Sequence, residues 1–233
     1  MRTHPRTRPV LFAFVMLILL TTACASQPVL DTPGVGDTQV PIATPPEPTP
    51  FEATLNGMSM VIPEGWYAAE VSLERLEALI FVQQDPSMLA EFDDPDLAVP
   101  LDYAAGALII TPLPEGSDAE TLRESMLGAI ADLTADDLDA MLLPLDQAGL
   151  IDYIAVEGAQ LLQADIDLLA GNQALMMEGM VTFIDELPPE LHIQIWLTWW
   201  EDSFIAYYTL ATEQAWEDAE APLVAAHASV SIR

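Results

Sequence analysis

"HIQIWLTWWEDSFIAYYTL", residues 192–210, is the clearest structural pattern in the chain. Apolar and polar side chains alternate on both sides of Glu201-Asp202, and a period of two predicts β-strands. We therefore expect a hairpin that turns at Glu201-Asp202. One face of this hairpin is almost wholly apolar and is predicted to be core: Ile193, Ile195, Leu197, Trp199, Phe204, Ala206, Tyr208 and Leu210.

The opposite face of the predicted hairpin is mixed and aromatic. Trp196, Trp200 and Tyr207 lie on it, and flat aromatic rings suit sugars or peptide partners. These three residues are the candidate ligand-binding residues of the sequence. The alternative is that the helix containing Trp216 covers them and completes a second core layer.

The remaining elements predict strands that outnumber helices. Helices are expected after a capping box at Ser117, after Thr134, and from Thr212 to a limit at Pro222. Strands and turns are expected in the following stretches: 57–71 with a turn at 63–65, 79–82, 107–111, a hairpin within 160–185 turning at Gly171-Asn172, and 228–232. The fold class predicted from these elements is α+β, a twisted antiparallel sheet with helices packed on it.

The order of these elements resembles PsbP-like domains. The resemblance rests on the strand that ends in "IPEGW" (62–66), a helix after the middle strands, a long hairpin pair, and a C-terminal helix followed by "SVSIR" (229–233). It covers 51–233 and implies a PsbP-like domain with a non-enzymatic accessory or binding role. No set of functional residues carries over from the family.

Cys24 is the only cysteine and follows the apolar run 10–20. Three arginines precede that run, which is shorter than the roughly 20 apolar residues that span a bilayer. This layout is typical of a secretory signal. The sequence Leu20-Thr21-Thr22-Ala23 before the cysteine resembles the bacterial lipobox, which implies a lipid on Cys24 and a position on a cell membrane, outside the cytoplasm. The alternative is a free thiol left by cleavage elsewhere.

The chain is thus predicted to have three parts. Residues 1–23 form the signal peptide, and 24–50 form the lipidated cysteine and a linker rich in proline and threonine. Such a linker buries too little apolar surface to fold. Residues 51–233 form a single domain of ordinary size.

The charge balance is strongly acidic, with 37 acidic residues against six arginines, no lysine and a formal net charge of −31. Nucleic acid is excluded as a partner, because binding phosphates requires clustered lysine and arginine. An anionic membrane surface would also repel the domain, which favours a covalent lipid anchor. We expect salt, low pH or bound cations to screen the repulsion between carboxylates.

The sequence contains no catalytic motif of the common hydrolase, nucleotide-binding or zinc-protease types. His192 and His227 could contribute to a zinc site with carboxylates, but we interpret them as structural. Two acidic runs, 91–96 and 132–139, could bind divalent cations weakly, although neither has EF-hand spacing.

We therefore expect no cofactor, no metal site and no catalytic residue. The function predicted from the sequence is that of a membrane-anchored module that binds an unknown protein or small ligand. The alternatives are an envelope hydrolase that uses carboxylates and a cation-binding structural surface protein.

Overall fold

The computed structural model describes residues 51–73, 76–83, 102–113, 116–148, 150–151, 156–183 and 190–232. The predicted signal peptide, the linker and Cys24 lie outside the described residues, and so does the acidic run 91–96. Within the described part, none of the helices has the length and apolar character needed to cross a membrane.

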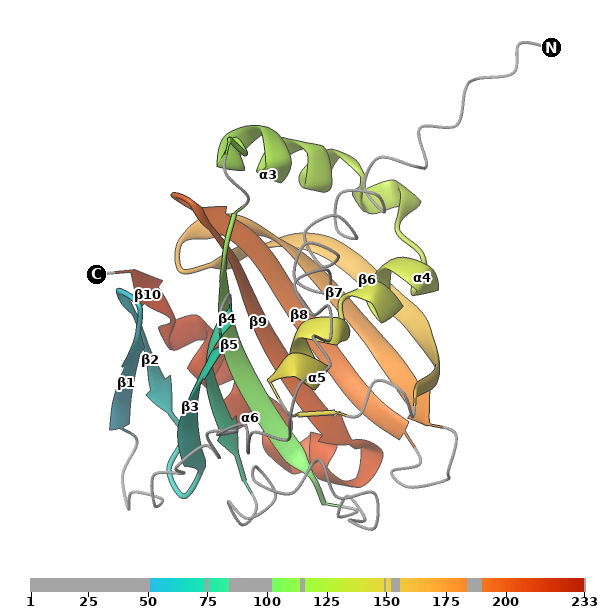
Figure 1. The fold of residues 1–233 in the computed structure, drawn as a ribbon. Helices are drawn as coiled ribbons and strands as arrows, with labels where there is room; N and C mark the ends of the chain where they lie inside the picture. Colours follow the sequence, from blue (N-terminus) through green and yellow to red (C-terminus); the bar gives the residue numbers. More distant parts are fainter. Residues whose placement is uncertain are drawn as a thin grey trace, which may run out of the picture.

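The described residues form two antiparallel sheets (Figure 1). The larger one has seven strands in the order β3-β4-β5-β9-β8-β7-β6, and the smaller has three in the order β1-β2-β10. The strands are β1 (Phe51–Leu55), β2 (Met58–Ile62), β3 (Tyr67–Leu73), β4 (Leu76–Val82), β5 (Ala104–Pro112), β6 (Val156–Leu169), β7 (Asn172–Phe183), β8 (Glu190–Trp200), β9 (Ser203–Thr212) and β10 (Ser231–Ile232).

The predicted hairpin of residues 192–210 is confirmed as β8 and β9, which lie side by side within the larger sheet. They turn at Glu201-Asp202, and the register pairs Ile195 with Tyr208 and Trp196 with Tyr207. Residues directly opposite each other share one face of a sheet. All eight side chains predicted to be core lie in or against one hydrophobic cluster, so the alternation predicted the correct face.

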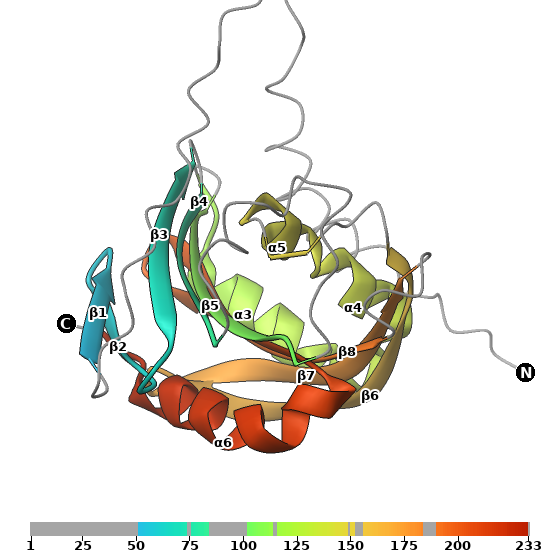
Figure 2. The same ribbon diagram turned by 90° about the horizontal axis from the view of Figure 1, so that it is seen from below.

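Helices cover both faces of the larger sheet (Figure 2). One face, here called the inner face, packs against α3 (Ala119–Gly128), the 3-10 helix η1 (Ile130–Asp132), α4 (Ala135–Ala140) and α5 (Leu143–Gln147). The other, here called the α6 face, packs against α6 (Glu213–Ser229) and the smaller sheet. The predicted α+β class, with a twisted antiparallel sheet and packed helices, is therefore confirmed.

The ends of the helices and one turn correct three details of the sequence prediction. Asp118, not Ser117, is the N-cap of α3, because its carboxylate accepts the backbone N–H of Glu120. The turn between β6 and β7 is Ala170-Gly171, one residue earlier than predicted. α6 begins after Thr212 as predicted but continues through Pro222 to Ser229.

The continuation of α6 past Pro222 has a physical reason. A proline inside a helix removes one hydrogen bond and disfavours the helix by about 3 kcal/mol. The residues of α6 that are buried on the sheet, Ala215, Ala219, Leu223 and Ala226, keep helical spacing on both sides of the proline. Burial of this apolar stripe offsets the cost of the proline.

Candidate functional site

A hollow of about 720 Å³ lies where the larger and smaller sheets meet at the end of β8. Trp200 is the large aromatic side chain in its wall and is 39% exposed. Three segments that are distant in sequence line it: Ala170, Gly171 and Asn172; Trp200; and Val230, Ser231 and Ile232. We call this feature the Trp200 hollow.

Local backbone geometry positions each wall of the hollow. The Ala170-Gly171 turn has positive φ at both residues, 51° and 80°, which is the conformation of tight two-residue hairpins. Asn172 steadies this turn by donating its side-chain N–H to the Ala170 carbonyl at 3.4 Å. Trp200 is the last residue of β8 before Glu201, which also has a positive φ of 50°.

The third wall of the hollow comes from the end of α6 and from β10. The backbone N–H of Val230 donates to the His227 carbonyl where the helix ends. β10 then pairs with β2, with Ser231 opposite Ser59 and Ile232 opposite Met58. The hollow is therefore held by both sheets and by one helix end.

The three candidate ligand-binding residues differ in their exposure to solvent. Trp196 is 5% exposed and Tyr207 is fully buried on the α6 face, whereas Trp200 reaches solvent. The indole N–H of Trp196 donates to Asp167 at 2.8 Å, and the Tyr207 hydroxyl donates to the Leu223 carbonyl at 2.9 Å. α6 thus covers two members of the predicted platform and leaves one exposed.

His227 belongs to this covered aromatic group. Its ring stacks on Trp196 with centroids 4.2 Å apart, and its Nε2 atom is buried without a hydrogen-bond partner among the described residues. Burial lowers the pKa of His227, while Asp167 and a backbone hydrogen bond at Leu168 act in the opposite direction. Burial raises the pKa of Tyr207 as well.

His192 occupies a separate position near the start of α6. Its Nε2 atom lies 2.7 Å from Oε1 of Glu178, and its ring is 3.7 Å from that of Trp216 between centroids. The two histidines therefore have different neighbours. In the described ranges, no three His, Cys, Asp or Glu side chains group as metal ligands would.

The acidic residues of the described part serve local structure or face solvent. Asp137 caps α4 by accepting the backbone N–H of Thr134 at 2.8 Å. No aspartate or glutamate of the described residues is buried. A buried, converging pair of carboxylates in a cleft is the feature that would support the hydrolase alternative.

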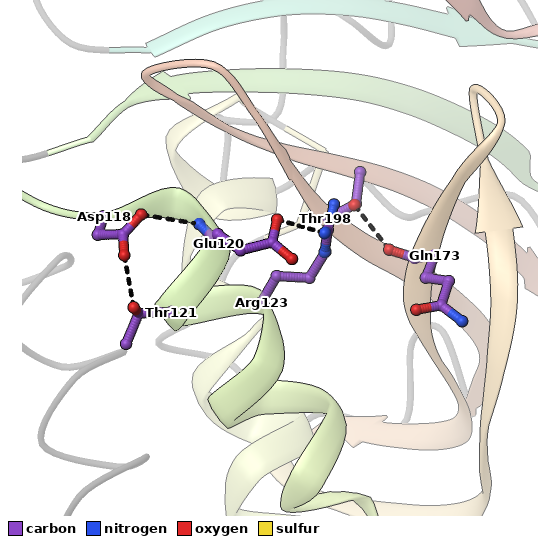
Figure 3. A network of polar contacts seen from close by, with 6 residues as sticks. All are labelled: Asp118, Glu120, Thr121, Arg123, Gln173 and Thr198. Carbon is purple, nitrogen blue, oxygen red and sulfur yellow. Dashed lines mark hydrogen bonds and ion pairs between the residues drawn. The ribbon is translucent and has the colours of Figure 1, made fainter.

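Polar contacts gather at the N-terminus of α3 (Figure 3). Arg123 is the one cation among the described residues other than histidine, and it forms an ion pair with Glu120 in the same helix. Asp118 accepts the Thr121 hydroxyl beside it. On the sheet, the Thr198 hydroxyl donates to the Gln173 carbonyl at 2.8 Å and ties β8 to β7 near the hollow.

Comparison with known proteins found similarity at the level of structure. No family model matches the chain, and no curated protein matches it. Cyanobacterial PsbP (CyanoP) from Synechocystis sp. is similar with a TM-score of 0.48 and 15% identity, covering 88% of this chain and 99% of that one. The Ran-binding protein Mog1p of Saccharomyces cerevisiae has a TM-score of 0.38 and 10% identity, covering 80% and 96%.

LpqN of Mycobacterium tuberculosis, described as involved in cell envelope biogenesis, is similar with a TM-score of 0.31 and 9% identity. The match covers 82% of this chain and 91% of that one. At these identities each match is a likeness of fold and assigns no activity to this chain.

Of the residues that line the hollow, only Trp200 was predicted from the sequence as a candidate. The other walls of the hollow come from residues 170–172 and 230–232. The turn chemistry near Gly171 and the final strand were predicted separately. Nothing in their composition indicated that they meet Trp200, because that contact depends on how the two sheets pack.

Proposed function

We propose that the chain is a lipid-anchored accessory module of the cell envelope with a PsbP-like domain, which faces outside the cytoplasm and binds a ligand or partner at the Trp200 hollow. The observation that supports the binding role is Trp200, which is 39% exposed and lines a hollow of about 720 Å³. Binding sites are concave and lined largely by apolar and aromatic groups, with a few polar groups that set orientation.

The residues that line the hollow indicate which kinds of ligand it could bind. Trp200 and Ile232 offer apolar surface, whereas Val230 is buried. Asn172 contributes an amide, and Ser231 contributes a hydroxyl that is hydrogen-bonded to the Ser59 hydroxyl at 2.9 Å. Among the described residues no charged side chain lines the hollow, and Glu201 and Asp202 follow Trp200 directly. With a formal net charge of −31, the molecule repels anions. The ligand is therefore expected to be neutral or cationic and to stack on an indole.

The anchoring role rests on Cys24. Two acyl chains, at about 0.8 kcal/mol for each buried methylene, hold a protein stably on a membrane. We expect Cys24→Ser to release the protein from the membrane fraction. Mass spectrometry of the native protein should find an acylated N-terminus at residue 24. Sedimentation of Cys24→Ser with membranes after a carbonate wash would contradict the anchor.

Binding at the hollow is tested by photo-crosslinking in the membrane fraction. A photoreactive phenylalanine analogue at Ser231 places the probe in the wall of the hollow. The expected result is a discrete crosslinked product that Trp200→Ala removes. Val61→Ala is the matched control, because Val61 is also exposed, at 38%, and does not line the hollow. A product pattern that Trp200→Ala leaves unchanged would contradict the proposal.

A further inference from the structure

β6 is a free edge of the seven-stranded sheet within the described residues. It pairs with β7 on one side, and no backbone-to-backbone hydrogen bond of the described residues outside that ladder involves it. The Leu168 backbone forms a hydrogen bond with the side chain of His227 in α6. It is 14 residues long and contains no proline and no lysine. Proteins usually keep free edges short or interrupt them with such residues, because exposed backbone groups pair with other extended chains.

Only the second half of β6 has regular geometry. Register shifts against β7 lie between Val156 and Gly158 and between Leu161 and Gln163. From Gln163 to Leu169 the pairing with β7 is unbroken. Bulges bend a strand and disturb further pairing. An additional strand would therefore fit against residues 163–169.

The two faces of this half differ in chemistry. Ile166 is opposite Leu175 on the inner face, and Leu168 shares that face. Their side chains are 49% and 56% exposed. Asp165 and Asp167 point to the α6 face and are also exposed. The edge thus presents apolar side chains on one face and carboxylates on the other.

One backbone group of this edge already faces away from β7. The Ile166 N–H donates to Oδ1 of Asp165 at 2.7 Å, so the ladder does not use it. The carboxylate occupies the place that a carbonyl of an added strand would take. A strand that displaces it must supply a carbonyl to Ile166 and a positive charge to Asp165.

We propose that residues 163–169 of β6 dock an extended segment of a partner in which apolar residues alternate with lysine or arginine. Its apolar side chains would lie beside Ile166 and Leu168, and its basic side chains beside Asp165 and Asp167. A second copy of this chain does not fit, because it would bring aspartates and two molecules of net charge −31 together. The proposal does not depend on the Trp200 hollow.

The test uses the full chain and a fluorescent, end-blocked heptapeptide in which valine and arginine alternate. One control peptide has the same composition with the arginines in one block, and another has glutamate in place of arginine. Anisotropy should show saturable binding of the alternating peptide and at least about tenfold weaker binding of both controls. Equal binding of the blocked and alternating peptides would mean simple charge attraction and would overturn the proposal.

Variants of the protein locate the binding. Ile166→Pro removes the N–H that faces away from β7, and the hydrogen bonds between β6 and β7 stay intact. This variant should weaken peptide binding at least about tenfold. Asp165→Asn should weaken binding and flatten its dependence on NaCl, and this variant decides the question if the proline variant does not fold. Glu157→Gln, in the irregular half of β6, is the matched control and should bind as the wild type does.

Two further measurements establish whether the peptide occupies the edge of β6. Trp200→Ala should leave peptide binding unchanged, and a loss would place the peptide in the Trp200 hollow and overturn the proposal. Sedimentation should show a monomer. A dimer that Ile166→Pro dissociates would identify a second copy as the occupant and would also overturn the proposal.

Discussion

His227 has an environment that favours its neutral form. Its ring packs against Trp196 and Tyr207, with centroid distances of 4.2 and 5.3 Å. Burial is the largest influence and lowers its pKa below the ordinary value of 6.5, against the opposing effect of Asp167. The folded protein therefore resists protonation at this residue more than the unfolded chain does.

This difference predicts how stability depends on pH. As the pH falls below about 6.5, the unfolded chain binds a proton at His227 before the folded protein does, so stability is lost until the pH passes the lower folded pKa. Between pH 7.5 and 5.5, the melting temperature should fall more in the wild type than in His227→Gln, which cannot titrate at this position. Identical changes in the two proteins would contradict the assignment.

Gly106 is a second position at which a single substitution is expected to change the stability of the protein. It lies opposite Phe81 on β4, and a methyl group at Gly106 would overlap the Phe81 ring, which is fully buried. We expect Gly106→Ala to lower the free energy of unfolding by about 1–3 kcal/mol, as overpacking does. Urea unfolding of Gly106→Ala, Phe81→Leu and the double variant provides the measurement. The double variant should lose less than the sum of the two single losses, and simple additivity would contradict the overlap.

At the scale of elements, alternation along β8 and β9 was sufficient to predict their faces. Ile195 and Tyr208 belong to one core, and Trp196 and Tyr207 to the other. The alternation did not decide whether the second face meets solvent, because that depends on the length of α6. The apolar spacing of Leu223 and Ala226 beyond Pro222 was the signal that the helix continues.

Pro222 offers a direct test of α6. In a helix interior, proline removes a hydrogen bond to the carbonyl four residues earlier, here that of Asp218. Pro222→Ala restores this bond without removing a fully buried side chain, since Pro222 is only partly buried. We expect the free energy of unfolding to rise by up to about 3 kcal/mol. A lower melting temperature by calorimetry, with Val224→Ala in the same helix as the control, would show that the proline is needed for packing.

For the whole molecule, charge is the dominant property. A formal net charge of −31 with no lysine opposes the compact state through repulsion between carboxylates. At roughly 0.1 M salt the screening length is about 10 Å, so added salt weakens the repulsion between exposed carboxylates that are farther apart than this. We expect the melting temperature to rise as NaCl is raised from low to molar concentration, and an unchanged melting temperature would contradict this account.

The same measurement with divalent cations distinguishes binding from screening. The acidic run 132–139 belongs to a segment in which Asp137 caps α4, and the described residues contain no metal-ligand group. Equal shifts in calcium and magnesium would indicate screening alone. A larger shift in calcium would indicate a specific weak site.

The sequence was sufficient to predict the fold class, but it was not sufficient to predict the candidate site. Strand alternation and helix caps depend on neighbouring residues, so the α+β class followed from local pattern. The Trp200 hollow depends on segments near residues 170, 200 and 230 meeting in space. That meeting is set by the packing of the two sheets, which no short stretch of sequence encodes.

The position of β10 has a practical consequence for anyone who purifies this protein. Ile232 pairs with Met58 and also lines the Trp200 hollow. Any segment fused directly behind Ile232 would begin beside that wall and compete for the same space. Ligand screening is therefore best performed with protein from which any such fusion has been removed.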